Sequence, residues 1–258
     1  MPFATRDGVR LYWKLEGASA NPPLVLLNSV GTEMGMWDRA IPFLLEDFLL
    51  LRIDARGHGA SDSPDADYSL ALLAGDVLAV MDAAGIEKAV VAGVSLGGMI
   101  AMELALLAPD CVAGLGLIGT TAALYPAMWN DRIAKVRAEG MASIADMVMT
   151  RFLTPGFIAD RPEYAETIHR TVLSTPAVGY AGCGAAIRDM ALLERLPGIA
   201  APTVVVVGAD DVSTPLAGNG DQLLALIPGA RLEQIGGPHI TPMEDPQGVA
   251  RALASHFA

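Results

Sequence analysis

Short runs of apolar, β-branched residues alternate with longer amphipathic stretches over the first 119 residues of the chain. Runs that are apolar throughout are typical of strands buried on both faces of a parallel sheet, whereas apolar positions three and four apart indicate helices. The pattern predicts strands at 9–15, 24–27, 49–53, 89–92 and 115–118, and helices at 36–45, 69–84 and 96–108. This succession predicts a doubly wound, mostly parallel α/β sheet.

The pattern changes between residues 120 and 196, where no convincing strand occurs. Helices are predicted there at 132–136, 143–152, 163–173 and 184–193, with breaks at Pro155-Gly156, Pro162 and Thr175-Pro176. Strands resume at 203–207 and 231–235, and a helix at 247–257 closes the chain. We therefore expect an α/β core of residues 1–119 and 197–258. Residues 120–196 would be a helical cap inserted over the carboxyl ends of the strands, where such sheets bind ligands.

The strand at 89–92 leads into Gly93-Val94-Ser95-Leu96-Gly97, which has the form G-x-S-x-G. Between a strand and a helix, this form is typical of a nucleophilic serine on a sharp turn, where glycines keep side chains out of the bend. Ser95 would then stand at a helix N-terminus, where free N–H groups favour negative charge. A buried serine in a glycine-rich turn is the alternative interpretation.

A serine nucleophile on this scaffold is followed along the chain by an acid and then a histidine. The strand at 203–207 is followed by Asp210 and Asp211, and the strand at 231–235 by a glycine-rich segment that ends in His239. We predict His239 as the base and Asp211 as its acid. Asp210 is the alternative acid, because neighbouring side chains diverge and only one of them can face His239.

The other three histidines are predicted to lie outside the catalytic group. His58 precedes Ser95 in the chain, an order that does not suit the base, and is predicted to be a structural loop residue. His169 and His256 are predicted to face solvent. An oxyanion hole requires two backbone N–H donors. Leu96, directly after the serine, and Val30, in the loop after the strand at 24–27, are predicted to supply them.

Composition and charge exclude several classes of protein. A chain of 258 residues, of which 52% are hydrophobic, is long and apolar enough for one α/β domain with a sizeable core. The net charge of −12 argues against a nucleic-acid partner. It also means that an anionic substrate would need a local basic group. Arg132 and Lys135 lie close to Trp129 on one helical stretch, so either could pair with a substrate carboxylate or face solvent.

Cysteine usage and hydropathy add further expectations. Cys111 and Cys183 make no disulfide framework and are predicted to be buried free thiols, and no Cys or His spacing indicates a metal site. The sequence has no apolar leader and no run of about 18 uninterrupted apolar residues. We expect a cytoplasmic protein without a membrane partner; the sequence does not indicate its oligomeric state.

The chain resembles the α/β-hydrolase superfamily over its whole length, and most closely the 3-oxoadipate enol-lactonases of the β-ketoadipate pathway. The matching stretches are 27–32 with Met36-Trp37-Asp38, 52–61, 93–99, 129–134, 179–183 and 214–218. Asn28-Ser29 stands where many relatives have His-Gly, and the residues on both sides of His239 differ from the family pattern. The resemblance implies an α/β-hydrolase fold with an inserted helical cap.

The resemblance also implies hydrolysis of a small lactone by Ser95, His239 and Asp211 through an acyl-enzyme, without cofactor or metal. Trp129 would form an apolar wall of the pocket, and Arg132 would pair with a carboxylate of the substrate. Alternatives within enzymes are a carboxylesterase, a lactonase for another ring or a cofactor-free perhydrolase. From another class, the alternative is a non-catalytic ligand receptor on the same scaffold.

Overall fold

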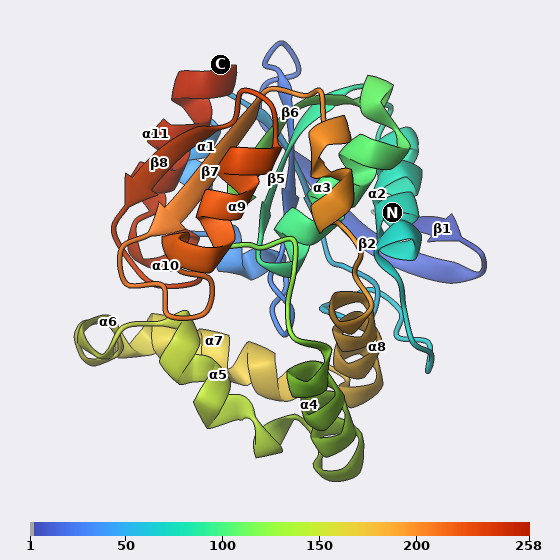
Figure 1. Ribbon diagram of the computed structural model, residues 1–258, viewed down its shortest axis with the longest axis vertical. Helices are drawn as coiled ribbons and strands as arrows, with labels where there is room; N and C mark the ends of the chain where they lie inside the picture. Colours follow the sequence, from blue (N-terminus) through green and yellow to red (C-terminus); the bar gives the residue numbers. More distant parts are fainter. Residues whose placement is uncertain (1–2) are drawn as a thin grey trace.

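The computed structural model describes residues 3–258, which form an eight-stranded sheet in the order β1-β2-β4-β3-β5-β6-β7-β8 (Figure 1). The strands are β1 (Phe3–Arg6), β2 (Val9–Glu16), β3 (Pro23–Leu27), β4 (Leu49–Ile53), β5 (Ala89–Val94), β6 (Val112–Ile118), β7 (Thr203–Gly208) and β8 (Arg231–Ile235). β1 and β2 pair antiparallel, and β2 pairs antiparallel with β4, whereas every other pairing is parallel. The predicted mostly parallel sheet is therefore confirmed.

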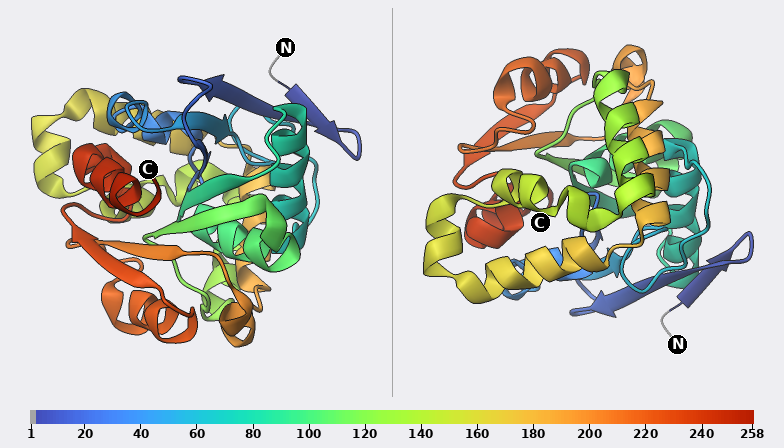
Figure 2. Two further views of the ribbon diagram at one scale, coloured as in Figure 1. Left: turned by 90° about the horizontal axis from the view of Figure 1, so that it is seen from above. Right: turned by 90° about the horizontal axis from the view of Figure 1, so that it is seen from below.

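Burial explains why the apolar runs form the middle of the sheet. Every residue of β5 and β7 is buried, as expected where helices cover both faces. β8 lies at the edge and has three exposed residues among its five. Figure 2 shows α2 (Leu70–Ala83) and α3 (Leu96–Leu107) on one face of the sheet and α1 (Ile41–Leu44) and α11 (Pro246–Phe257) on the other.

A second group of helices lies together at one end of the sheet, below the strands in Figure 1. These are α4 (Pro126–Glu139), α5 (Ala145–Phe152), α6 (Pro155–Asp160), α7 (Pro162–Ser174) and α8 (Ala177–Arg188). The remaining helices are α9 (Asp221–Leu226) and α10 (Thr241–Glu244), with short helical turns η1 (Met34–Trp37), η2 (Pro109–Cys111), η3 (Met141–Ser143), η4 (Leu193–Gly198) and η5 (Leu216–Gly220). In the described residues 3–258, no helix is long and apolar enough to cross a membrane.

Proline positions account for two differences from the predicted elements. The helix expected at 36–45 is divided into η1 and α1, and Pro42 lies in the first turn of α1, where a missing N–H is tolerated. The break expected at Pro155-Gly156 instead begins α6: Thr154 accepts a hydrogen bond from the Phe157 N–H at 3.2 Å, and Pro155 follows this cap.

Tertiary packing accounts for two further differences. The helix expected at 184–193 is α8, which begins at Ala177 and ends at Arg188, although its glycines lower helix propensity. A Cβ on Gly179 would lie 2.1 Å from the Gly57 oxygen, so this glycine is needed for close packing on the loop after β4. β1 was not predicted, because its four residues gain their place mainly by pairing with β2.

Candidate active site

Ser95 lies on a sharp turn between β5 and α3. It has φ +56° and ψ −115°, a strained conformation for a residue with a side chain. A Cβ on Gly93 would lie 2.2 Å from the Gly97 carbonyl carbon, and a Cβ on Gly97 would lie 2.5 Å from the Leu27 oxygen. Both glycines are therefore required by close backbone contacts, and the G-x-S-x-G spacing follows from them.

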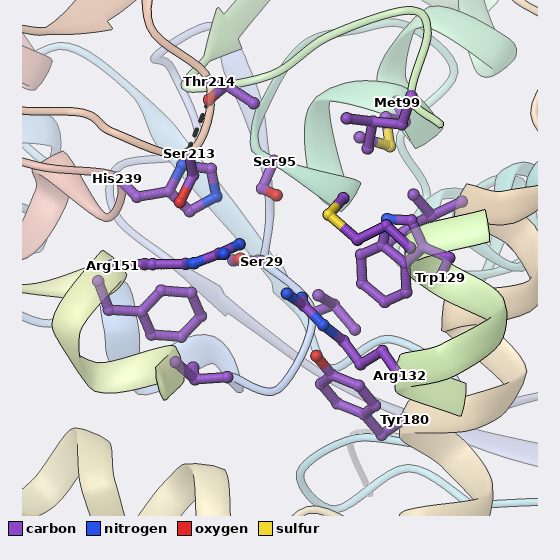
Figure 3. A pocket seen from close by; sticks show the side chains of 16 residues that line it. Ser29, Ser95, Met99, Trp129, Arg132, Arg151, Tyr180, Ser213, Thr214 and His239 are labelled. Atoms are coloured by element: carbon purple, nitrogen blue, oxygen red, sulfur yellow. Dashed lines mark hydrogen bonds between the residues drawn. The ribbon is translucent and has the colours of Figure 1, made fainter. Parts of the chain in front are cut away.

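Hydrogen bonds hold this strained turn in place. The Ser95 N–H donates to the Ile118 oxygen at 3.0 Å, and the Thr120 hydroxyl donates to the Ser95 oxygen at 2.7 Å. The end of β6 thus fixes the backbone of Ser95 on both sides. Its side chain lines a pocket to which α4 and α5 also contribute residues (Figure 3).

His239 and Asp211 come together from the ends of β8 and β7. The His239 Nδ1 lies 3.0 Å from Asp211 Oδ2 and 3.2 Å from Oδ1. Asp210 is exposed, whereas Asp211 is 5% exposed. With its proton on Nδ1 directed at Asp211, the imidazole keeps Nε2 free to accept a proton. Of the two neighbouring acids, the structure therefore places Asp211 against the histidine.

The surroundings of Asp211 keep it ionised. Burial opposes the charge, but hydrogen bonding to His239, the charge of His239 and donors from Thr214 together hold the pKa of Asp211 below its usual value. Asp211 Oδ1 accepts from the Ser213 and Thr214 N–H groups at 2.8 and 3.0 Å, and Oδ2 accepts from the Thr214 hydroxyl at 2.8 Å. The Phe152 ring stacks on the imidazole of His239, with the two ring centroids 6.0 Å apart.

The loop after β3 carries the predicted oxyanion donor Val30. Within residues 3–258 neither the Val30 nor the Leu96 N–H has a hydrogen-bond acceptor, and Val30 lines the same pocket as Ser95. Asn28 anchors the start of this loop: its amide donates to the Ile53 oxygen at 2.8 Å and accepts from the Trp37 indole at 3.1 Å. Two free N–H groups at this place can hold an oxyanion.

His58 fixes the other end of this loop. It is 1% exposed, and its Nε2 accepts a hydrogen bond from the Gly31 N–H at 2.9 Å. Burial lowers the pKa of His58 to about 4, so the ring is neutral and can accept this bond. His58 therefore has a structural role, as predicted, and this role is to hold the backbone next to Val30.

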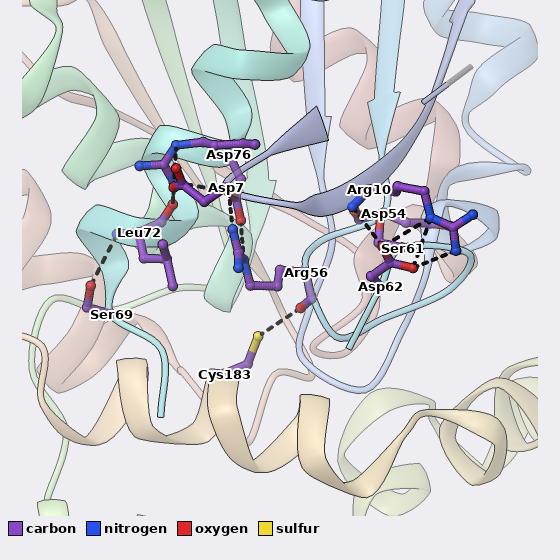
Figure 4. Close-up of polar contacts among 11 residues, drawn as sticks. Asp7, Arg10, Asp54, Arg56, Ser61, Asp62, Ser69, Leu72, Asp76 and Cys183 are labelled. Atoms are coloured by element: carbon purple, nitrogen blue, oxygen red, sulfur yellow. Dashed lines mark hydrogen bonds and ion pairs between the residues drawn. The ribbon is translucent and has the colours of Figure 1, made fainter. Parts of the chain in front are cut away.

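The segment that carries His58 is itself anchored by a buried ion pair. Arg56 donates to both oxygens of Asp76 on α2 at 2.7 Å, and the Cys183 thiol of α8 lies 3.5 Å from the Arg56 oxygen (Figure 4). Both side chains of the pair are nearly fully buried. This segment therefore connects α2 and α8 to the loop that carries Val30, the predicted oxyanion donor.

The predicted pocket residues Trp129 and Arg132 both line the cavity, which encloses about 570 Å³ including its open mouth (Figure 3). The Arg132 guanidinium lies 4.7 Å from the centre of the Trp129 ring. Within residues 3–258 no carboxylate lies within 4.0 Å of it. Lys135, the other cation of this stretch, is exposed and does not line the cavity.

Sequence reasoning missed five polar residues of the pocket, which are Ser29, Arg151, Tyr180, Ser213 and Thr214. Arg151 lies on α5 between the buried residues Met149 and Phe152. A lone arginine next to the apolar side of a short helix was an available signal. For Ser29 and Tyr180 the sequence carries no comparable signal, because their position depends on how the loop after β3 meets α8.

The remaining predictions concern residues outside the pocket. Cys183 is buried as predicted, but Cys111 is partly exposed, because it lies in η2 at the edge of the core. His169 is partly exposed and lies 3.9 Å from Asp146. The expectation that His256 faces solvent is wrong: its side chain is 13% exposed and bonds the Ala252 oxygen at 2.9 Å, since α11 packs on the sheet. Within residues 3–258 no His, Cys, Asp and Glu group could hold a metal ion.

Comparison with known proteins gives similarities along nearly the whole chain. The family described as the alpha/beta hydrolase fold matches residues 22–246. The chain is 33% identical over 250 residues to 3-oxoadipate enol-lactonase 2 of Acinetobacter baylyi, which covers 96% of this chain and 93% of that protein.

Two solved structures are similar over the same extent. A hydrolase from Pseudomonas aeruginosa is 39% identical, with a TM-score of 0.94, over 99% of this chain and 97% of that one. The enol-lactonase from Burkholderia xenovorans is 32% identical, with a TM-score of 0.95, over 99% of each chain. The similarities therefore do not rest on isolated motifs.

The buried neutral His58 predicts a particular loss of stability in acid. In the unfolded chain, His58 binds a proton once the pH falls below 6.5, its usual pKa. In the folded chain, its pKa is about 4, so it binds a proton only near pH 4. The stability that the folded state gains by keeping His58 neutral is therefore fully present above pH 6.5, and it declines as the pH falls toward 4. Between pH 7 and 5, we expect the free energy of unfolding of the native chain to fall by about 2 kcal/mol more than that of His58→Gln.

Urea unfolding of both proteins at the two pH values measures this difference, with His169→Gln as the control for removing a more exposed imidazole. If the free energy of unfolding falls equally in the native chain and in His58→Gln between pH 7 and 5, His58 is not held neutral.

Proposed function

Since the chain belongs to the α/β-hydrolase family, we propose that it opens 3-oxoadipate enol-lactone to give 3-oxoadipate. The predicted fold is confirmed, and the chain is a hydrolase that acts on ester bonds. The observation that carries the finer proposal is the Arg132 guanidinium, which lines the pocket of Ser95 and His239 without a carboxylate partner in residues 3–258. The proposed substrate has one carboxylate, which fits this unpaired cation.

The proposed reaction proceeds through an acyl-enzyme. Ser95 attacks the ring carbonyl while His239 Nε2 takes its proton, and Asp211 stabilises the imidazolium that forms. The Val30 and Leu96 N–H groups donate to the oxyanion. The ring C–O bond then breaks, and the leaving oxygen takes the proton from His239 to give an enol. The enol becomes the ketone when its oxygen loses that proton and the neighbouring alkene carbon gains one from water. Water activated by His239 attacks the ester to Ser95, which releases a carboxylate and restores the serine.

We also propose that residues 120–196 act as a cap over this pocket, between core residues 1–119 and 197–258. The support is that α4 supplies Trp129 and Arg132, α5 supplies Phe152, and α8 supplies Tyr180 to the cavity that contains Ser95. Trp129, 4% exposed, would form an apolar wall beside the ring of the substrate. Substrate selection would then depend on the cap, and the chemistry on the core.

Other esters remain the alternative substrates of this hydrolase. An esterase, another lactonase or a perhydrolase would use the same three residues and differ in its acyl group. A receptor would keep its response to the ligand in Ser95→Ala, because it needs no turnover. The geometry of Asp211, His239 and the free N–H groups favours an enzyme.

Replacing the nucleophile tests the chemistry directly. Ser95→Ala is expected to lower kcat by about 10⁴- to 10⁶-fold, as removal of a triad member does in serine hydrolases, while the circular dichroism spectrum stays unchanged. A fluorophosphonate should acylate the native protein at Ser95, as mapped by mass spectrometry. Labelling at another serine would refute this assignment.

The two neighbouring acids give a matched pair of variants. Asp211→Asn is expected to lower kcat by about 10⁴-fold, because the amide no longer favours the tautomer that leaves Nε2 free. Asp210→Asn should change kcat far less, because the Asp210 side chain is exposed. Steady-state kinetics of both variants on one substrate checks the ranking, and the reverse ranking would assign the acid to Asp210.

The role of Arg132 is tested by substrate preference. A charged hydrogen bond from arginine to carboxylate contributes about 1.5–3 kcal/mol, so Arg132→Ala should lower kcat/KM for the carboxylated lactone by about ten- to a hundredfold. Activity on a neutral ester should hardly change. Lys135→Ala, which removes an exposed cation from the same helix, is the matched control. Equal losses on both substrates would make Arg132 a structural residue.

A further inference from the structure

Arg151 is a second cation of the pocket that the proposed reaction leaves without a role. Its side chain extends from α5 toward the centre of the cavity, while Arg132 reaches in from α4 (Figure 3). Within residues 3–258 no carboxylate lies within 4.0 Å of Arg151. Burial and the neighbouring positive charge of Arg132 hold the pKa of Arg151 below its usual value. Two guanidinium groups therefore share one pocket without a counterion in the described chain.

Ser29 adds a buried group without a partner. It is 1% exposed, lines the same pocket, and its hydroxyl makes no hydrogen bond within residues 3–258. The Trp129 Nε1, which is also buried and also belongs to a pocket residue, likewise has no acceptor there. Buried polar groups are nearly always paired in native proteins, so these groups indicate a ligand rich in acceptor oxygens.

We propose that Arg151 and Ser29 form a second anion subsite, distinct from Arg132, and that the pocket binds short molecules with two carboxylates. The proposal rests on the proposed function and extends it from the substrate to the product. Hydrolysis of a lactone with one carboxylate creates a second carboxylate at the former ring carbonyl. Arg132 would hold the carboxylate that the substrate brings, and Arg151 with the Ser29 hydroxyl would hold the new one.

The position of Ser29 in the chain supports this division. Ser29 directly precedes Val30, which lines the pocket and whose N–H has no acceptor among residues 3–258. A carboxylate released from Ser95 starts beside Val30, next to Ser29. The guanidinium offers paired donors to such a planar anion, and the hydroxyl offers one more.

Equilibrium binding of two unreactive acids tests the subsite without turnover. Adipate has two carboxylates on a six-carbon chain, and hexanoate has one. Isothermal titration calorimetry of the native protein should give an adipate affinity at least about tenfold higher than that for hexanoate, because each charged contact adds about ten- to a hundredfold. Similar affinities for the two acids would contradict the second subsite.

Variants then assign the contacts. Arg151→Gln should lower adipate affinity by about ten- to a hundredfold and leave hexanoate affinity within about twofold, since Arg132 still holds one carboxylate. Lys135→Gln, which changes the net charge equally, should leave both affinities unchanged. If Arg151→Gln weakens both acids equally, the two arginines clamp one carboxylate and the proposal is wrong.

Ser29→Ala separates a binding role from a structural one. Because the hydroxyl has no partner in residues 3–258, its removal should leave Tm unchanged or raised, while adipate affinity falls by about tenfold. A lowered Tm with unchanged adipate affinity would contradict the proposal. The outcome is also independent of the substrate: adipate binding that depends on Arg151 would stand even if the enol-lactone is not hydrolysed. If the enol-lactone is hydrolysed but adipate binding does not depend on Arg151, the second subsite is refuted and the proposed reaction stands.

Discussion

The backbone conformation of Ser95 is the constraint on which the rest of the site depends. A residue other than glycine keeps a φ of +56° only where the surrounding structure holds its backbone in place. Here β6 holds it through Ile118 and Thr120, and close contacts to Leu27 and within the turn require glycine at 93 and 97. The turn brings the start of α3 against β3, and Ser95 and Val30 line the same pocket.

A chain of contacts connects the loop after β3 to α2 and α8. His58 accepts from Gly31, the Arg56–Asp76 pair anchors the loop of His58, and α8 packs on that loop at Gly179 and Cys183. Tyr180 of α8 also lies against Gly31, where an added Cβ would be 3.2 Å from its ring. The loop after β3 is therefore held by the same helix that forms part of the pocket, so loop position and pocket shape are set together.

The sequence predicts well what depends on local pattern. Apolar β-branched runs such as 203–207 identify buried strands, and a serine between glycines after a strand identifies the turn. The limits appear where packing decides: α8 forms despite its glycines because they allow contact with Gly57, and Pro155 begins a helix because Thr154 caps it. Arg151 could have been found as a lone arginine beside the apolar side of a short helix. Ser29 could not, because its hydroxyl matters for having no partner within residues 3–258, and this is visible only once its neighbours are placed.

Two arginines without a carboxylate partner in residues 3–258 line the pocket of an acidic protein, and we propose that they select a carboxylated lactone. The most direct measurement is kcat/KM of the native protein for 3-oxoadipate enol-lactone and for the methyl ester of its carboxylate, which keeps the ring and removes the charge. We expect a preference for the charged lactone of about ten- to a hundredfold. Equal or faster hydrolysis of the neutral ester would contradict it.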